Sequence, residues 1–343
     1  MYEGIEGSEG TAGSVSYDAT GEETGSQPGI EELFMNMLRR KTGRVFGSAL
    51  AVILMFCMTI QAGAVSVSPA GATEETESVT AAPVYTEKQL YQIISDKLLA
   101  RKKQFTISCR RNAAVDSIVN RINSISDSEF YSVFFDVAQA VDDKNTTDDS
   151  DYLYGLIRGA NCYYAEGGLH FYGLQYFESK KQTEAVNRKV KTVAGKIKKK
   201  GKNRVQRIAY AYQYVISHVK YDIRKNCNYS AYDGFYKKKT VCNGYALMMY
   251  KLLMQMNIPC RFVTGSVKEG KRWYLHAWNI VEIKGKWYNL DACFDDADDG
   301  NVYSDYFLKT DKVYKKDHKK DTFYQTKAYQ KAYPMAKKNY KLS

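Results

Sequence analysis

Apolar and polar positions along the chain follow two periods, and each period predicts a different kind of element. The predicted helices span 181–199 and 203–219, and the predicted strands span 274–283 and 286–292. The second of these helices carries Ile208, Tyr212, Val215 and Val219 on one face. The two strands alternate and are separated only by Lys284-Gly285, so a tight hairpin is expected there.

The segment "TVCNGYALMMYKLL" is apolar on almost every side. From Tyr245 to Met256 it predicts a buried helix whose polar side chains, Lys251 and Gln255, form a narrow stripe exposed to water. Asn257 and Pro259 would end this helix.

Cys242 then lies at the helix N-terminus, where the helix dipole and the free N–H groups favour an anion and make a thiol nucleophilic. A buried structural cysteine is the alternative interpretation, because free cysteines are commonly buried. A catalytic thiol also needs a base.

His276 is the candidate base, and the hairpin register supplies its partner. If Ile283 pairs with Lys286, Asp291 lies opposite Trp278 and diagonally beside His276. Cys242, His276 and Asp291 would then form a relay in which the carboxylate orients the imidazole and the imidazole activates the thiol. A hydrogen-bonded structural pair is the alternative for His276 and Asp291.

The same register places a second thiol, Cys293, directly opposite His276. Cys293 is beyond the reach of any helix dipole, and Phe294 suggests an apolar setting, so Cys242 is expected to be the nucleophile. A reversible disulfide between the two thiols is a further expectation.

Four segments resemble the transglutaminase-like superfamily, whose members are relatives of papain-type thiol enzymes. These segments are "AYDGFYKKKTVCNGYA", "NIPCRFVTG", "HAWNIVEIKGKWYNLDACFDD" and "DYFLKT", and the resemblance covers about residues 203–310. It implies a papain-like α+β core in which the cysteine helix packs on an antiparallel sheet, with Cys242 as nucleophile, His276 as base and Asp291 as orienting acid. The sequence departs from the usual family segment Asp-Pro-Thr-Trp-Asp, because Asp291 is followed by Ala-Cys-Phe-Asp.

Other residues receive weaker assignments. Tyr232 matches a tyrosine that precedes the nucleophile in relatives and is a candidate oxyanion donor together with the backbone N–H of Cys242. Trp278 and Trp287 are expected in the core and at the groove wall. His170, His218 and His318 are interpreted as isolated or structural, and the spacing of the cysteines predicts neither a metal site nor a cofactor.

The first part of the chain is interpreted as a leader. Residues 37–64 combine a basic start, an apolar run shorter than the roughly 20 residues of a membrane span, and a small-residue cleavage pattern, so they predict a signal peptide or an anchor. Residues 1–36 are acidic and are expected to be untranslated or disordered, with translation starting at Met35 or Met37. Residues 65–83 predict a disordered linker, 84–180 an accessory α/β region, and 181–343 the catalytic domain.

Charge narrows the classes of partner. The chain has a formal net charge of +12 even with its acid-rich leader, and lysine clusters occur at 196–202, 237–239 and 315–320. Solvated lysine-rich faces that keep the protein soluble are the first interpretation. Such a surface also attracts polyanions, and an exported protein is then expected to meet an anionic wall polymer or a membrane surface rather than nucleic acid. The sequence thus predicts an exported acyl-transfer enzyme that acts on protein or wall-peptide amides. Cysteine peptidase or amidase activity and a non-catalytic wall-binding module remain alternatives.

Overall fold

The computed structural model describes residues 82–124, 127–139, 151–223, 229–296 and 304–341. The predicted leader (1–36), the signal segment (37–64) and nearly all of the predicted linker (65–83) lie outside the described residues. None of the described helices is both long enough and apolar enough to cross a membrane.

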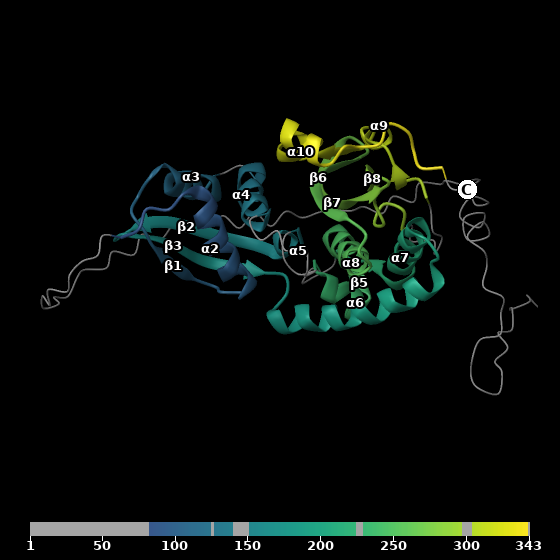
Figure 1. Ribbon diagram of the computed structural model, residues 1–343, viewed down its shortest axis with the longest axis horizontal. Coiled ribbons are helices and arrows are strands. Elements are labelled where there is room, and N and C mark those ends of the chain that lie inside the picture. The colour runs from purple at the N-terminus through teal and green to yellow at the C-terminus, as the bar shows by residue number, and fades with distance from the viewer. Residues whose placement is uncertain (1–81, 125–126, 140–150, 224–228, 297–303, 342–343) are drawn as a thin grey trace, which may run out of the picture. The chain divides into compact units, whose positions relative to one another are not determined.

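The second half of the described chain is built on a five-stranded sheet whose strand order is β10-β6-β7-β8-β9 (Figure 1). Its strands are β6 (Cys260–Glu269), β7 (Arg272–Ile283), β8 (Lys286–Leu290), β9 (Phe307–Lys309) and β10 (His318–Lys320). Every neighbouring pair runs antiparallel. Gly265 allows the edge strand β10 to approach, because a Cβ at this position would lie 2.1 Å from the Lys319 carbonyl oxygen.

Three helices precede or pack on this sheet: α6 (Lys180–Lys200), α7 (Arg204–His218) and α8 (Cys242–Gln255). Their bounds agree closely with the predicted ones. Asn203 caps α7 by accepting a hydrogen bond from the Gln206 N–H. Helix α8 packs against β6, β7, α6 and α7, and the side chain of Asn279 on β7 donates to the Ala246 carbonyl of α8. The chain thus has the predicted α+β architecture, with the cysteine-bearing helix on an antiparallel sheet.

The first part of the described chain forms a second, three-stranded antiparallel sheet of order β1-β3-β2, accompanied by helices (Figure 1). Its elements are α2 (Glu87–Leu99), β1 (Phe105–Ser108), α3 (Ala113–Ile122), α4 (Asp127–Gln139), α5 (Asp151–Leu156), β2 (Ile157–Ala165) and β3 (Gly168–Tyr176). Helix α2 begins with a capping box formed by Thr86 and Gln89.

Short elements complete the fold. They are β4 (Lys220–Tyr221), a π-helical turn η1 (Asp233–Lys237), β5 (Lys239–Thr240), α9 (Asp311–Tyr314), a 3-10 turn η2 (Thr322–Gln325) and α10 (Lys327–Ala332). Strands β4 and β5 pair in parallel, with Tyr221 beside Thr240, and this pairing brings the end of α7 next to the start of α8.

The predicted hairpin register is confirmed, but the predicted end of its second strand is wrong. Ile283 pairs with Lys286, and Lys284 and Gly285 adopt positive φ angles as a tight turn requires. Strand β8 ends at Leu290 rather than at 292. The carboxylate of Asp291 accepts backbone hydrogen bonds from the two residues after Ala292, and this folds the chain into a turn.

The predicted exposed stripe on α8 is also wrong. Lys251 is 0% exposed, and its ammonium lies 4.1 Å from the centre of the Tyr152 ring and bonds to the side chain of Asn187. Helix α5 and helix α6 therefore cover the face that the sequence pattern assigned to water. The end of α8 agrees with the prediction, because Met256 is the C-cap and Asn257 has a positive φ angle.

Candidate active site

Cys242 is the first residue of α8, and its side chain is half-buried. The preceding residue, Val241, provides no side-chain cap, so the first turn of the helix is open to an anion. Asn243 fixes this turn, because its side-chain amide donates to the carbonyl oxygens of Gly155 (3.0 Å) and Tyr229 (2.6 Å). The helix thus holds a thiol at the position where its dipole favours a thiolate.

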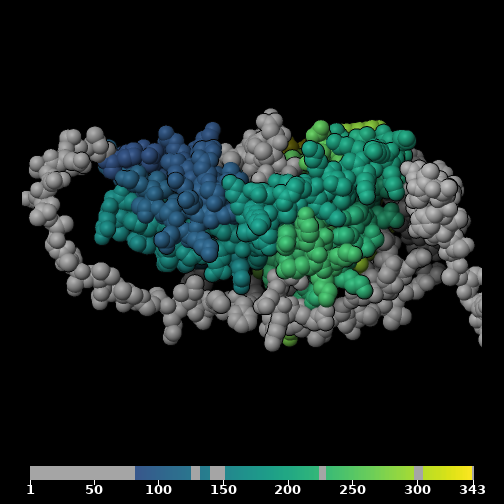
Figure 2. Space-filling view, turned by 90° about the horizontal axis from the view of Figure 1, so that it is seen from below, coloured from purple at the N-terminus to yellow at the C-terminus, as the bar shows by residue number. Residues whose placement is uncertain are grey.

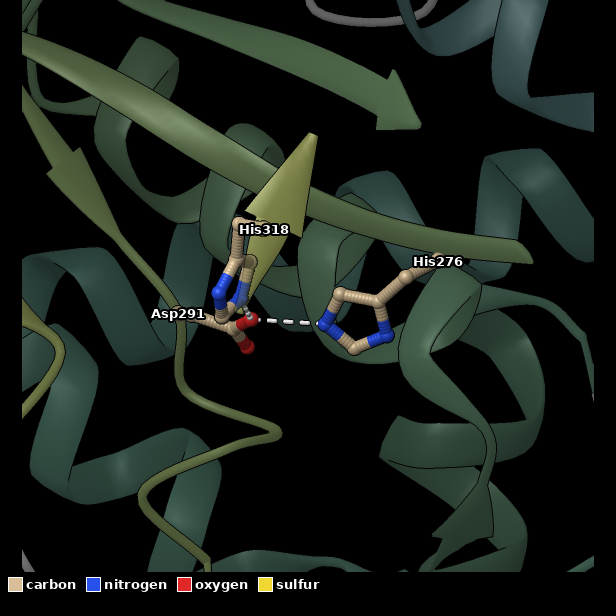
Figure 3. Close-up of side chains that lie close together, drawn as sticks. All are labelled: His276, Asp291 and His318. Carbon is tan, nitrogen blue, oxygen red and sulfur yellow. Dashed lines mark hydrogen bonds and ion pairs between the residues drawn. The ribbon is translucent and has the colours of Figure 1, made fainter. Parts of the chain in front are cut away.

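His276 lies in the middle of β7, where it pairs with Gly265 of β6 and is buried. Its Nε2 atom lies 2.6 Å from Oδ2 of Asp291 (Figure 3). The thiol of Cys242 lies close enough to the imidazole to raise its pKa. Burial lowers the pKa of His276, but the charges of Asp291 and Cys242 outweigh burial and raise it to about 10. The imidazole of His276 is therefore charged at neutral pH.

Asp291 follows the last residue of β8 and is 1% exposed. Its Oδ1 atom accepts the N–H groups of Cys293 and Phe294, each at 3.0 Å. Its Oδ2 atom accepts from His276 and, at 3.0 Å, from Nε2 of His318. Burial alone would raise the pKa of this carboxyl, but His276 and His318 hold it well below its usual range. Asp291 is thus a carboxylate held by four donors.

The sequence predicts that His318 is isolated, and this prediction is wrong, because the structure places His318 in this cluster. It lies on β10, and its second nitrogen, Nδ1, is 2.6 Å from Oδ1 of Asp317 (Figure 3 shows the Asp291 side of the ring). Little in the sequence indicates this position, because "KKDHKK" resembles a solvated lysine run and β10 has only three residues.

Among the described residues, His276, Asp291 and His318 also form a cluster of potential metal ligands, with donor atoms within 4.8 Å of one another. The two imidazole nitrogens, however, contact the same carboxylate oxygen at 2.6 and 3.0 Å. A zinc ion would need bonds of about 2.0–2.2 Å to each ligand with the ion between them. The arrangement observed is a hydrogen-bonded chain.

Cys293 does not lie on a strand opposite His276 as predicted, because β8 has already ended and the chain turns at Asp291. Its thiol nevertheless remains near the site. Burial raises the pKa of Cys293 well above its usual value, and the negative charges of Asp291 and Cys242 add to this effect. The five cysteines described by the structure, including Cys242 and Cys293, are free thiols.

A second tyrosine, which no sequence pattern indicates, lies near the two thiols. Tyr221 is on β4, and burial, followed by the charges of Cys242 and Cys293, raises its pKa. The predicted oxyanion candidate, Tyr232, donates its backbone N–H to Glu178 and stacks its ring on Tyr236. The structure therefore brings Tyr221 into the electrostatic environment of Cys242.

The two tryptophans have different surroundings. Trp278 is buried beside the site, with its ring centre 6.0 Å from that of His276. Trp287 is buried against Tyr333 near the C-terminus, with ring centres 5.1 Å apart. Trp278 thus forms part of the wall behind the imidazole, and Trp287 belongs to the core.

Comparison with solved structures finds partial similarities. A candidate cysteine protease of Cytophaga hutchinsonii is 25% identical, with a TM-score of 0.29 over 34% of this chain and 40% of that one. A TGase is 17% identical, with a TM-score of 0.29 over 40% and 44%. The periplasmic domain of TgpA from Pseudomonas aeruginosa, bound to ethylmercury, is 16% identical, with a TM-score of 0.27 over 37% and 55%. The chain thus spans between 40% and 55% of the length of these structures. No curated protein matches the sequence.

The family model that matches this sequence is that of the transglutaminase-like superfamily, and the match covers residues 191–292. This range runs from the second half of α6 to just beyond the end of β8. It includes Cys242, His276 and Asp291 and excludes His318. The range that matches the superfamily model thus contains all three residues for which the sequence predicts catalytic roles.

Proposed function

We propose that this protein is a thiol enzyme that transfers an acyl group through a thioester on Cys242. The observation that supports the proposal is the position of His276, which is bonded to the Asp291 carboxylate through Nε2 and whose pKa is raised by both Asp291 and Cys242. A nucleophile, a base and an orienting acid in this order are what thiol acyl transfer requires.

The reaction would proceed in two stages. The Cys242 thiolate attacks the carbonyl carbon of an amide, the C–S bond forms, and the C–N bond breaks as the departing ammonia or amine takes a proton from the His276 imidazolium. Neutral His276 then accepts a proton from an incoming amine or water, which attacks the thioester and releases the thiolate. The acceptor decides whether the product is a cross-link or a hydrolysed acid.

The proposed substrate is a protein amide or a wall-peptide amide. Transamidation is the first candidate reaction, and hydrolysis, as by a cysteine peptidase or amidase, is the alternative. Both outcomes use the same three residues. A non-catalytic wall-binding module would not need a charged imidazole beside a cysteine, so the raised pKa of His276 favours an enzyme.

An extracytoplasmic location, secreted or attached to the membrane or wall, is proposed together with an anionic partner surface. The outer side of α6 is strongly basic: its exposed cations are Lys180, Lys181, Arg188, Lys191, Lys196, Lys198, Lys199 and Lys200. Seen from below, the teal residues that include α6 lie beside the green segment around η1 and β5, where Lys237, Lys238 and Lys239 are also exposed (Figure 2). Such a face would attract wall polymers or anionic head groups in a salt-dependent manner.

The test is the variant Cys242→Ala, assayed with casein and monodansylcadaverine for transamidation, with fluorescein-labelled casein for hydrolysis and with p-nitrophenyl acetate for acyl transfer in general. We expect loss of all three activities and an unchanged circular dichroism spectrum, because the thiol lies at the open end of α8 and not in its buried face. Cys293→Ser serves as the matched thiol control and should retain most of the activity. Activity in Cys242→Ala, or its loss only in Cys293→Ser, would contradict the proposal.

Labelling gives an independent measure. A substoichiometric amount of iodoacetamide at pH 6 should modify Cys242 before the other described cysteines, because Cys109, Cys162, Cys260 and Cys293 all have raised pKa values through burial. Mass spectrometry of the labelled peptides identifies the modified residue.

A further inference from the structure

His318 bonds to a carboxylate through each of its ring nitrogens. Nε2 lies 3.0 Å from Oδ2 of Asp291, and Nδ1 lies 2.6 Å from Oδ1 of Asp317. A carboxylate oxygen only accepts hydrogen bonds, and a neutral imidazole has a single N–H, so both bonds require both ring protons. The geometry is that of an imidazolium between two carboxylates.

The surroundings of the ring suit a cation. Four aromatic rings enclose it, with centres between 4.5 and 5.3 Å from its own: Trp278, Phe294, Tyr306 and Tyr314. Aromatic faces attract a cation, most strongly where water is excluded. The hydroxyl of Tyr306 also bonds to Asp317, so the carboxylate behind the ring is itself held in place.

The Asp291 carboxylate depends on this arrangement. Two backbone N–H groups hold its Oδ1 atom, but at Oδ2 only the His318 bond opposes the pull of His276. Without a second donor at Oδ2, the carboxylate could rotate and carry the imidazole of His276 with it. A small displacement of a reacting group is costly to catalysis.

We propose that His318 is a positioning residue, held as an imidazolium between Asp291 and Asp317, that fixes the Asp291 carboxylate so that His276 faces Cys242. This inference rests on the proposed function of the three residues and extends it to β10, which lies outside the range matched by the family model. His318 itself touches neither the thiol nor the reacting atoms, and it acts through Asp291.

The cation also influences the charge state of His276. The charged groups around His276 are Asp291, Cys242 of α8, Glu269 of β6 and His318 of β10. The two imidazole rings are 5.6 Å apart, so a cation at His318 opposes the protonation of His276. Loss of this cation therefore moves the titration of His276 to higher pH, whereas loss of a merely structural contact would not.

The proton state of His318 can be measured directly by NMR. The chain has four histidines, so selective labelling with ¹⁵N-histidine gives a simple spectrum that single-histidine variants can assign. At pH 7 both ring nitrogens of His318 should show the shifts of protonated nitrogen. An unprotonated ring nitrogen on His318 at pH 7 would overturn the proposal, whether or not the enzyme is active.

Two variants test its effect on the site. His318→Phe removes both donors, and p-nitrophenyl acetate turnover should fall by about 10²-fold, as expected for a misplaced catalytic group. His318→Gln keeps an uncharged donor toward Asp291, so the loss should be about tenfold, with kcat and not KM affected. In both variants the His276 titration should move upward. Parent-like rates, or a stationary His276 titration, would contradict the proposal.

The controls separate this proposal from the proposed function. His170 is a histidine with two hydrogen bonds, to Thr106 and to the Ala165 carbonyl, in the three-stranded sheet, and His170→Phe should change neither rate nor titration. If Cys242→Ala remains active, the proposed function fails, while the NMR measurement still decides the state of His318. If circular dichroism shows that His318→Phe does not fold, the rate and the His276 titration of His318→Gln alone test the proposal.

Discussion

At the scale of single residues, the site depends on the charge of Asp291. Burial lowers the pKa of His276, but this carboxylate, together with Cys242, raises it to about 10, so the imidazole remains charged throughout the neutral range. A group whose pKa is raised in the folded protein loses its bound proton only as the pH passes the raised value. The activity of the enzyme should therefore persist well into the alkaline range and decline near pH 10, where His276 loses its proton.

Asp291→Asn should move that alkaline limit to lower pH. The amide carries no charge, so the pKa of His276 falls toward its ordinary value, and the amide can also favour the wrong imidazole tautomer. The rate of p-nitrophenyl acetate turnover should drop by about 10³- to 10⁴-fold, while iodoacetamide still modifies Cys242. A pH–rate profile measured from pH 5 to 10.5 checks both effects. An alkaline limit that stays near pH 10 in the variant would exclude Asp291 as its cause.

The two tyrosines near the start of α8 should behave differently. Burial and the neighbouring Cys242 and Cys293 raise the pKa of Tyr221, so its hydroxyl remains protonated and is a candidate donor to an oxyanion that forms at the thiol. Tyr221→Phe should lower the rate of thioester formation by about 10²-fold. Tyr232→Phe is the matched control and should have a much smaller effect, because its interactions are with Glu178 and Tyr236. Burst kinetics with p-nitrophenyl acetate measure this step. The reverse order of effects would restore Tyr232 as the donor.

The sequence could predict which residues meet in the hairpin but not which residues meet across the sheet edge. His276 and Asp291 follow from local spacing, since a two-residue turn fixes their register. His318 reaches Asp291 only because β10 pairs with β6, a contact between segments distant along the chain. Tyr221 likewise depends on the pairing of two-residue strands, and so short a pattern carries no periodic signal.

At the scale of elements, the position of the thiol depends on how closely the start of α8 approaches β5. Gly244 lies in the first turn of the helix, and a Cβ there would be 1.8 Å from the Thr240 hydroxyl oxygen and 2.7 Å from its Cβ. Any side chain at this position must push the helix start away from the strand that precedes it. Because Cys242 is the first residue of the same turn, this displacement would move the thiol relative to His276.

Gly244→Ala should therefore reduce both stability and reactivity. Overpacking of this kind costs about 1–3 kcal/mol of unfolding free energy, and iodoacetamide modification of Cys242 at pH 6 should slow at the same time. Gly195→Ala is the matched control, because a Cβ at this position of α6 meets nothing within 4 Å and alanine favours a helix. Urea unfolding and labelling rates measure the two effects. Equal results for the two variants would show that the close approach at Gly244 has no influence on the thiol.

The errors of element prediction have local physical causes. The sequence pattern predicts that Lys251 is exposed to water, because lysine is seldom buried. In the structure its ammonium is buried, where it makes a cation–π contact with the Tyr152 ring and donates a hydrogen bond to the Asn187 side chain. The predicted strand is longer than β8 because the alternation of apolar and polar residues continues past Leu290. In the structure the Asp291 carboxylate accepts hydrogen bonds from the next backbone N–H groups, which are therefore not available for strand pairing.

At the scale of the whole molecule, a buried ion pair joins the accessory elements to the five-stranded sheet. Asp151, at the start of α5, is 0% exposed and accepts two bonds from Arg261 of β6, at 2.5 and 2.7 Å, and one from the Phe262 N–H at 2.8 Å. Arg261 also donates to Gln139 of α4 and to Tyr333. These bonds cross the domain boundary predicted near residue 180. Helices α4 and α5 of the accessory region therefore help to hold β6, the strand that pairs with both β7 and β10.

Asp151→Ala should destabilise the protein far more than the loss of an exposed ion pair. The substitution leaves the Arg261 guanidinium buried without its carboxylate, which costs about 3–5 kcal/mol. Asp116→Ala is the matched control, because the Arg111–Asp116 pair is largely exposed, with side-chain exposures of 66% and 43%, and such pairs contribute less than about 1 kcal/mol. Urea unfolding followed by tryptophan fluorescence compares the two, since Trp278 and Trp287 are buried in the sheet that Arg261 supports. If Asp151→Ala lost no more unfolding free energy than Asp116→Ala, the ion pair would not be what holds the accessory elements against the sheet. The contacts of α5 with α8 and β6 would then have to account for this packing.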